Sequence, residues 1–257
     1  MLKTKNIHHI GILGAMPEEV VNGLKYLSNI KKNIFGDLII YSGCWKSKNK
    51  EKKIYISLAW SGWGKVSASR AAARLLSLNI KGIPSISTII FSGVAGAANE
   101  EIKQWDIIIP SELIQYDMDG SPIFPKFVIP ALNQSKLKMN LDLLDWTTST
   151  IKTFLKSNLN LPFGNVYNGL IGTGDQFISE EKDLEYLKKQ LPGLNAIEME
   201  GAALAQVAIQ ENISWIIIRV ISDNAKTSAE KNFREFVENY EQSSWTLINC
   251  LLSKWPF

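Results

Sequence analysis

Cysteine and histidine are scarce in this sequence of 257 residues, which holds only two of each. Cys44 and Cys250 lie far apart in the chain, so they supply neither a disulfide framework nor a four-ligand zinc site. We expect both to be reduced thiols in the core. His8 and His9 are neighbours that point to opposite faces of an extended segment. A histidine-based catalytic triad or metal site is therefore not expected, and we interpret both residues as structural.

Long apolar runs are absent as well. The longest candidates, such as Trp215–Ile221, are interrupted by a charge and fall short of the roughly 18 residues that a membrane-spanning helix requires. The first residues run directly into the segment from His8 to Gly14, without the apolar core and cleavage site of a secretory signal. We therefore expect a cytoplasmic protein that does not bind a membrane.

Arginine is rare, with Arg70, Arg74, Arg219 and Arg234 alone, and the formal net charge is only +3. The remaining cations are lysines scattered among acidic residues, a pattern typical of a solvated surface. Nucleic acid is therefore not expected as a partner. The one basic cluster, Lys46–Lys53, lies between two strand-like runs and is interpreted as the tip of a hairpin.

Apolar sequence is abundant: 46% of the residues are hydrophobic and 21% are charged, which allows a large buried core. Strand-like runs alternate with helical stretches, which indicates an α/β sheet. No linker, repeat or low-complexity tract divides the chain, so residues 1–257 are predicted to form a single domain. The expected strands are Ile7–Leu13, Asp37–Ser42, Lys53–Trp60, Ser87–Ser92, Asp106–Ile109, Asn165–Ile171, Ala196–Met199 and Trp215–Ile221. The expected helices are Pro17–Ser28, Val66–Leu78, Asn140–Lys156, Glu180–Gln190, Glu200–Glu211 and a long terminal helix over Phe233–Leu252.

Small residues follow several of the expected strands. These strand ends are Gly14-Ala15-Met16, Gly93-Val94-Ala95-Gly96, Gly172-Thr173-Gly174-Asp175 and Ser222-Asp223. Ligands of open α/β sheets collect beyond the carboxyl ends of strands, where backbone amides are free to bind them. The four ends are therefore predicted to line one pocket. The spacings of the phosphate-binding loop and of the dinucleotide fingerprint are both absent.

Four charged residues stand out near these strand ends. Glu19 and Glu200 each lie where a helix begins, a position in which a carboxylate often serves only the helix dipole. Asp223 ends a buried strand, where an aspartate is often a site residue. Arg219 lies inside an apolar strand and needs an acidic partner or a ligand; a buried ion pair with Glu19 or Glu200 is the alternative to a functional role. Together these groups suit a polar, uncharged ligand with an apolar part, and they do not suit phosphate.

Six motifs occur in one order along nearly the whole chain. They are Gly14-Ala15-Met16-Pro17-Glu18-Glu19, Ser61-Gly62-Trp63-Gly64-Lys65-Val66, Gly93-Val94-Ala95-Gly96, Gly174-Asp175-Gln176-Phe177-Ile178, Glu198-Met199-Glu200-Gly201 and Arg219-Val220-Ile221-Ser222-Asp223. Together these motifs resemble the methylthioadenosine/S-adenosylhomocysteine nucleosidase family. Glu-Met-Glu and Ser-Asp also occur in related nucleoside phosphorylases, whereas Gly-Ala-Met followed by acids indicates the nucleosidase branch. The resemblance implies a three-layer α/β/α sandwich around a central mixed, twisted sheet. It also implies a homodimer whose partner helps to close each site.

The resemblance further implies a catalytic pair. Glu19 would activate water, and Asp223, oriented by Ser222, would protonate the purine N7. The implied substrate contacts are Met199 and Glu200 at the ribose, Arg219 near the water, Phe177 and Ile178 at the adenine, Met16 and Phe233 at the ribose and 5′ substituent, Trp63 beside that substituent, and the turn Val94, Ala95 and Gly96. No metal or other cofactor is implied.

The chemistry explains why two carboxyl groups are needed. Cleavage between ribose and adenine leaves an oxocarbenium-like sugar and an anionic base, so the base must accept a proton while water attacks the sugar. A carboxylate at Glu19 would repel phosphate, which favours hydrolysis over phosphorolysis. A futalosine-type hydrolase, a purine nucleoside phosphorylase and a nucleoside-binding protein without turnover remain the alternatives.

Two residues depart from the pattern of the family. Val94 stands where many relatives have serine, and Trp63 stands where an aliphatic residue is usual beside the 5′ substituent. The stretch Tyr116–Pro130 also differs, and it would border the 5′ pocket or the dimer contact. The preference between methylthioadenosine and S-adenosylhomocysteine is therefore left open.

Overall fold

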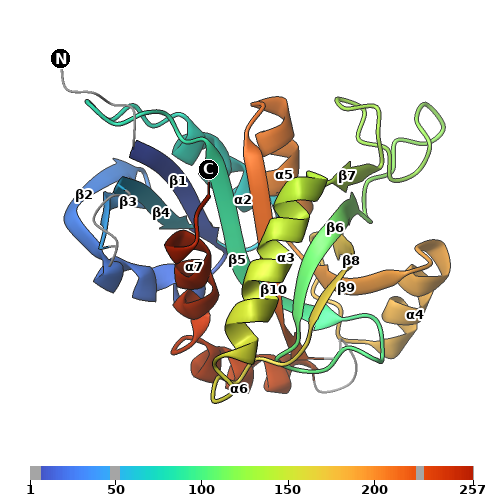
Figure 1. The fold of residues 1–257 in the computed structure, drawn as a ribbon. Helices are drawn as coiled ribbons and strands as arrows, with labels where there is room; N and C mark the ends of the chain where they lie inside the picture. Colours follow the sequence, from blue (N-terminus) through green and yellow to red (C-terminus); the bar gives the residue numbers. More distant parts are fainter. Residues whose placement is uncertain (1–6, 47–52, 224–228, 257) are drawn as a thin grey trace.

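A computed structural model of the chain describes residues 7–46, 53–223 and 229–256 (Figure 1). Its strands are β1 Ile7–Gly14, β2 Leu27–Phe35, β3 Leu38–Trp45, β4 Lys53–Trp60, β5 Thr88–Ala97, β6 Ile107–Gln115, β7 Lys136–Lys138, β8 Val166–Thr173, β9 Leu194–Glu198 and β10 Ser214–Asp223. Its helices are α1 Pro17–Val20, the 3₁₀ helix η1 Val21–Tyr26, α2 Lys65–Leu76, α3 Leu141–Lys156, α4 Glu181–Gln190, α5 Gly201–Gln210, α6 Ala229–Tyr240 and α7 Ser244–Ser253.

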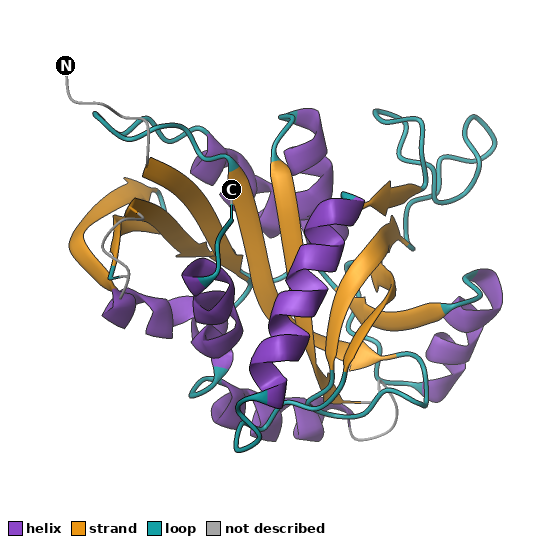
Figure 2. Ribbon diagram, in the orientation of Figure 1, coloured by secondary structure: helices purple, strands orange, loops and turns teal. Residues whose placement is uncertain are grey.

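The described residues form one mixed sheet of ten strands between layers of helices (Figure 2). Helices α2 and α5 pack together against one face of the sheet, and α1, α3, α6 and α7 pack against the other. β1 pairs in parallel with both β4 and β5, and β5 pairs in parallel with β10, whereas β2, β3 and β4 are antiparallel neighbours. The predicted three-layer α/β/α sandwich is therefore confirmed.

One half of the sheet closes on itself. β10 pairs with both β5 and β6, β6 pairs with β8, β8 with β9, and β9 returns to β5. Because β1, β5 and β10 run in parallel, their carboxyl ends lie at the same end of the sheet. This closure was not predicted from the sequence, and it brings together strands from the middle and last thirds of the chain, beside the end of β1 from the first third.

The central strands β1, β5 and β10 are buried along most of their length. Ile12 on β1, Phe91 on β5 and Ile217 on β10 are fully buried, as expected for parallel strands covered on both faces. His9 is also buried, with Nδ1 2.8 Å from the carbonyl of Pro84 and Nε2 2.8 Å from the hydroxyl of Ser57. Burial lowers the pKa of His9. Its interpretation as a structural histidine agrees with these contacts.

The helix predicted over Pro17–Ser28 is wrong beyond its first turns. The chain forms the short helix α1, tightens into η1, and then enters β2, a strand that the sequence reading missed. A Cβ atom at Gly23 would lie 2.4 Å from the Trp245 ring, so η1 packs closely on α7 at this point. The solvent-facing lysines of β2 obscured its strand character, because β2 is an edge strand that pairs only with β3.

The single terminal helix predicted over Phe233–Leu252 is also wrong, since α6 and α7 are separate helices. The carbonyl of Glu241 accepts hydrogen bonds from the Asn22 side chain at 2.6 Å and from the Ser244 hydroxyl at 2.9 Å. This break lets Tyr240 and Trp245 both turn into the core, where each is almost fully buried. The short strand β7, which pairs with β6, was likewise missed.

The two cysteines lie in different environments. Cys250 on α7 is buried as predicted, but Cys44 is exposed, so its prediction as a core thiol is wrong. By strand alternation Cys44 belongs to the same face of β3 as the buried Leu38, Ile40 and Ser42, but it lies one residue before the end of the strand and its side chain is exposed there. β3 and β4 are antiparallel, while the tip between them, residues 47–52, lies outside the described residues. In the described part of the chain, no helix is both long and apolar enough to span a bilayer.

Candidate active site

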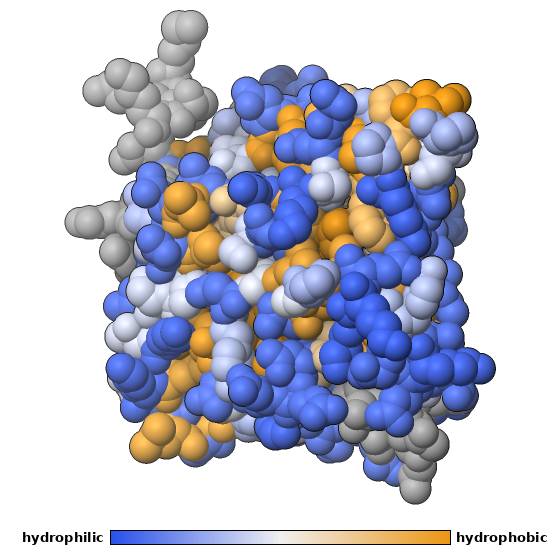
Figure 3. Space-filling view, turned by 90° about the vertical axis from the view of Figure 1, so that its right-hand side faces the viewer, coloured by the Kyte–Doolittle hydropathy of each residue, from blue (hydrophilic) through white to orange (hydrophobic). Residues whose placement is uncertain are grey.

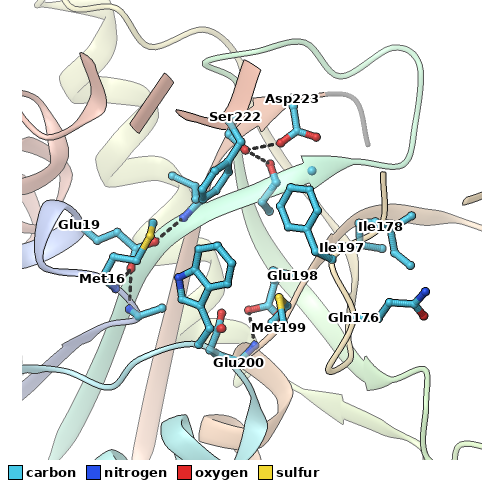
Figure 4. Close-up of a pocket in the computed structure, with 17 residues that line it drawn as sticks. Met16, Glu19, Gln176, Ile178, Ile197, Glu198, Met199, Glu200, Ser222 and Asp223 are labelled. Atoms are coloured by element: carbon cyan, nitrogen blue, oxygen red, sulfur yellow. Dashed lines mark hydrogen bonds between the residues drawn. The ribbon is translucent and has the colours of Figure 1, made fainter. Parts of the chain in front are cut away.

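A cavity lies at the carboxyl ends of β1, β5 and β10, and the elements that follow β8 and β9 also line it (Figure 4). Every residue of the expected site contributes to its wall except Arg219. Three of the four predicted strand ends therefore line the cavity; the fourth, Gly172-Thr173-Gly174-Asp175, does not, and only the residues that follow it, Gln176 to Ile178, reach the wall. Four residues of the wall were not among the expected contacts: Ala15, Gln176, Ile197 and Glu198.

Glu19 is held at one side of this cavity by backbone donors. One carboxylate oxygen accepts from the amides of Ala15 at 2.5 Å and Met16 at 3.0 Å, and the other accepts from the amide of Val94 at 3.1 Å. The side chain is buried because α1 begins directly after β1, with Pro17 in its first turn. Burial raises the pKa of Glu19, while Arg219 and the three amides oppose that rise. A carboxyl group whose pKa is moved toward neutrality is a stronger general base than an ordinary glutamate.

Asp223 reaches the cavity from the end of β10, beside Ser222. The Ser222 hydroxyl lies 2.7 Å from Asp223 Oδ2 and 3.3 Å from the carbonyl oxygen of Ala95. A hydroxyl carries one hydrogen, so it can donate to only one of these oxygens at a time. When Ser222 donates to the carbonyl of Ala95, its oxygen is free to accept a hydrogen bond from the protonated carboxyl group of Asp223. Ser222 can therefore accompany Asp223 in either protonation state.

Arg219 lies behind the cavity wall and pairs most closely with Glu198, a partner that the ion-pair interpretation did not name; it also forms a longer ion pair with Glu200, one of the two expected partners. Its Nη2 atom is 2.5 Å from Glu198 Oε2 and 4.0 Å from Glu200 Oε2. Its guanidinium also covers the ring of Phe91, at 4.0 Å from the ring centroid. Among the described residues, Nη1 of Arg219 has no hydrogen-bond partner.

Glu198 is the junction of this buried network. Its Oε2 atom also accepts from the amides of Glu200 and Gly201, and its Oε1 atom accepts from the hydroxyl of Thr173. Glu19, Glu198 and Glu200 were all possible partners for Arg219, and no rule of sequence spacing selects among them. In the structure Glu198 is selected because it ends β9, beside Thr173 at the end of β8.

Glu200 lines the cavity and uses one of its two carboxylate oxygens to hold the neighbouring backbone. Its Oε1 atom accepts from the amide of Gly64 at 2.8 Å. Burial, and then the neighbouring charge of Glu198, raise the pKa of Glu200. Figure 4 shows Glu19, Glu200 and Asp223 approaching the cavity from different sides, with Met199 beside Glu200.

Three aromatic rings close the cavity toward solvent. The rings of Trp63 and Phe177 are stacked with centroids 6.4 Å apart, and Phe233 meets them edge-on at 5.8 and 5.7 Å. Trp63 remains 49% exposed and Phe177 37% exposed. Such half-exposed rings provide an apolar wall at the outer end of the cavity. Within the described ranges, no three His, Cys, Asp or Glu side chains are grouped so that they could hold a metal ion.

Comparison with known proteins agrees with this geometry. Residues 9–253 match the family model of the phosphorylase superfamily. A curated 5′-methylthioadenosine/S-adenosylhomocysteine nucleosidase from Buchnera aphidicola is 34% identical over 243 residues, which cover 93% of this chain and 96% of the relative. The chain belongs to the methylthioadenosine/S-adenosylhomocysteine nucleosidase family of this superfamily.

The fold of this nucleosidase family member is also similar to solved structures of the family. The nucleosidase of Neisseria meningitidis, in complex with methylthio-immucillin-A, superposes with a TM-score of 0.82 at 26% identity and covers 96% of this chain and 99% of its own. The futalosine hydrolase of Helicobacter pylori superposes almost equally well, with a TM-score of 0.80 at 26% identity over 96% of this chain and 98% of its own. Fold alone therefore does not separate these two substrate classes.

Proposed function

We propose that this nucleosidase family member hydrolyses the N-glycosidic bond of methylthioadenosine and S-adenosylhomocysteine, and releases adenine and the thioribose product. The observation that carries the proposal is that Glu19 and Asp223, held by different strand ends, line one cavity. Two carboxyl groups with opposite protonation duties are what this reaction requires.

Asp223 protonates N7 of the departing adenine, and Ser222 orients its carboxyl group. Phe177 and Ile178 provide the apolar surface against which the adenine ring lies. As the glycosidic bond lengthens, positive charge develops on the ribose. Glu19 removes a proton from the attacking water, whose oxygen forms the new bond to the ribose carbon while the electron pair of the old bond leaves with adenine.

Glu200 and Met199 hold the ribose. The free oxygen of Glu200 accepts from the ribose hydroxyls, and once Glu200 has lost its proton its negative charge stabilises the developing cation more strongly than the neutral ground state. Arg219 lies behind the wall and is held by its ion pair with Glu198. Its positive charge favours the ionised forms of both Glu19 and Glu200. Met16 and the end of β5, from Val94 to Gly96, complete the ribose side of the cavity.

The electrostatics of the cavity favour hydrolysis over phosphorolysis. A phosphate dianion beside Glu19 would face a buried carboxyl group, and the guanidinium that could attract it is already bonded to Glu198. The test is adenine release from methylthioadenosine, measured first in phosphate-free buffer and then with phosphate. Free thioribose without phosphate supports the hydrolase, whereas release that depends on phosphate assigns a phosphorylase. Futalosine serves as a third substrate, because faster cleavage of it would assign a futalosine hydrolase.

The proposal includes a homodimer and a cytoplasmic location. Val66, at the start of α2, is 80% exposed, and Ile123, in the loop between β6 and β7, is 83% exposed. The ion pair between Lys65 and Asp117 joins these two segments beside the cavity. Apolar side chains also interrupt the hydrophilic surface on the face that carries this loop and α4 (Figure 3). Sedimentation of the protein tests the dimer, and a monomer at micromolar concentration would contradict it.

A further inference from the structure

The turn between β4 and α2 presents Trp63 to the cavity through an unusual backbone. Gly62 and Gly64 flank the tryptophan with φ angles of +84° and +90°, which glycine adopts readily and other residues rarely do. The amide of Gly64 donates to Glu200. The amide of the next residue, Lys65, donates to Asp175 Oδ1 at 2.7 Å. The turn that carries Trp63 is therefore held by two carboxylates, those of Glu200 and Asp175. Only Glu200 has a part in the proposed reaction.

Asp175 belongs to the segment that carries Phe177, the ring that stacks on Trp63. Its own amide donates to Asp117 Oδ2 at 3.0 Å, and Asp117 Oδ1 is 2.6 Å from the Lys65 ammonium group. These contacts connect the start of α2, the loop after β6 and the loop after β8. Because Asp175 accepts from the amide of Lys65 at the start of α2, its negative charge is also stabilised by the dipole of that helix.

The contacts of Asp175 limit how far the two rings can separate. Trp63 lies two residues before Lys65, and Phe177 lies two residues after Asp175. The hydrogen bond between Lys65 and Asp175 therefore joins the two turns close to their aromatic residues, and it sets the 6.4 Å spacing of the ring centroids. A longer side chain, or none, at position 175 would change that spacing.

We propose that Asp175 is a positioning residue for recognition of the 5′ substituent: by tying the Trp63 turn to the Phe177 loop, it sets the width of the aromatic opening that receives the thioether. This inference rests on the proposed function. Asp175 takes no part in bond cleavage, so its loss changes how the 5′ end is bound and leaves the chemical step intact. The opening discriminates between an adenine nucleoside with a 5′-methylthio group and one without it.

The test compares methylthioadenosine with 5′-deoxyadenosine, which lacks the thioether. Asp175→Ala is expected to raise KM for methylthioadenosine about tenfold, the effect of losing one charge-assisted hydrogen bond at the opening, with kcat within about twofold. KM for 5′-deoxyadenosine is expected to change less than threefold. Asp175→Asn keeps an oxygen that can accept from the Lys65 amide, so it is expected to restore most of the discrimination. Asp175→Glu keeps the charge but lengthens the link, and it is expected to reduce discrimination.

The control is Asp37→Ala. Asp37 pairs with Arg70 of the same helix α2 at 2.7 Å, but it lies away from the opening. This variant is expected to leave both KM values unchanged. Equal effects of Asp175→Ala on both substrates, or a fall in kcat alone, would overturn the inference. If the wild-type protein releases no adenine from methylthioadenosine, the proposed function itself fails, so the two failures are distinguishable.

Discussion

Replacing Gly93 by alanine probes the placement of Glu19 without altering any charged group. Gly93 on β5 is paired across the sheet with Arg219 on β10. A Cβ atom at this position would lie 2.6 Å from Glu19 Oε1, 3.0 Å from Glu19 Cδ and 2.7 Å from Arg219 Nη1. Because Glu19 is bonded to three backbone amides and Arg219 to Glu198, neither group can move away without losing a hydrogen bond.

The expected cost follows from the bond most exposed to this clash, which joins Glu19 Oε1 to the Val94 amide. Loss of a hydrogen bond to a charged group costs about 1.5–3 kcal/mol. If that loss falls on the reacting base, kcat/KM for adenine release decreases by a factor of about 10 to 150. Overpacking is expected to lower the free energy of unfolding by about 1–3 kcal/mol.

The measurement is steady-state adenine release from methylthioadenosine, with urea unfolding of the same samples. Gly11→Ala is the matched control, because Gly11 also lies in a buried parallel strand but its nearest neighbour is the Ile86 side chain at 3.3 Å. Gly11→Ala is expected to keep near-normal turnover. If Gly93→Ala retains kcat/KM within twofold of the wild type, the argument that Glu19 and Arg219 need this space is wrong.

Three further predictions concern other carboxyl groups and the thiols. Glu19→Gln and Asp223→Asn should each lower kcat by orders of magnitude while adenine nucleosides still bind; near-normal turnover in either variant would remove that residue from its role. The pKa of Glu200 is raised by burial, so the folded protein keeps a proton that the unfolded chain loses above pH 4.5. The free energy of unfolding should therefore fall as pH rises from about 4.5 to the folded-state pKa, and Glu200→Gln should flatten this slope in urea titrations at a series of pH values; an unchanged slope would contradict the assignment. Cys44 should react with a thiol reagent in the native protein, whereas Cys250, whose pKa burial raises to about 11, should react only after denaturation; reaction of both in the native state would contradict the burial of Cys250.

Local sequence signals were sufficient for most of the fold, and the family resemblance supplied most, but not all, of the residues that line the cavity. Asn140 accepts a hydrogen bond from the amide of Leu143, so the predicted start of α3 rests on a real cap. The small residues at the carboxyl ends of β1, β5 and β10 indicated where the cavity lies, although in β5 and β10 the strands continue through these residues instead of ending before them. The helix predicted after Pro17 was wrong because its packing on Trp245, more than two hundred residues away, overrides local propensity.

The ion-pair network could not be derived in the same way. Glu198, Glu200 and Glu19 are all acids near a strand or helix end, and their local patterns are alike. The partner of Arg219 is decided by the pairing of β8 with β9, which sets Glu198 beside Thr173. Sheet closure through β10 is likewise a long-range property, and no single segment encodes it.

The closed circuit of strands has a consequence for the order of events during protein synthesis. β10 leaves the ribosome after every other described strand, yet it occupies the position between β5 and β6 and brings Arg219 and Asp223. Until it is inserted, the edges of β5 and β6 that face it are unpaired, and Asp223, the proposed acid, is missing. A nascent chain that has not yet added β10 therefore lacks part of the proposed site, and its exposed edges are most vulnerable to aggregation or to chaperone capture in that interval.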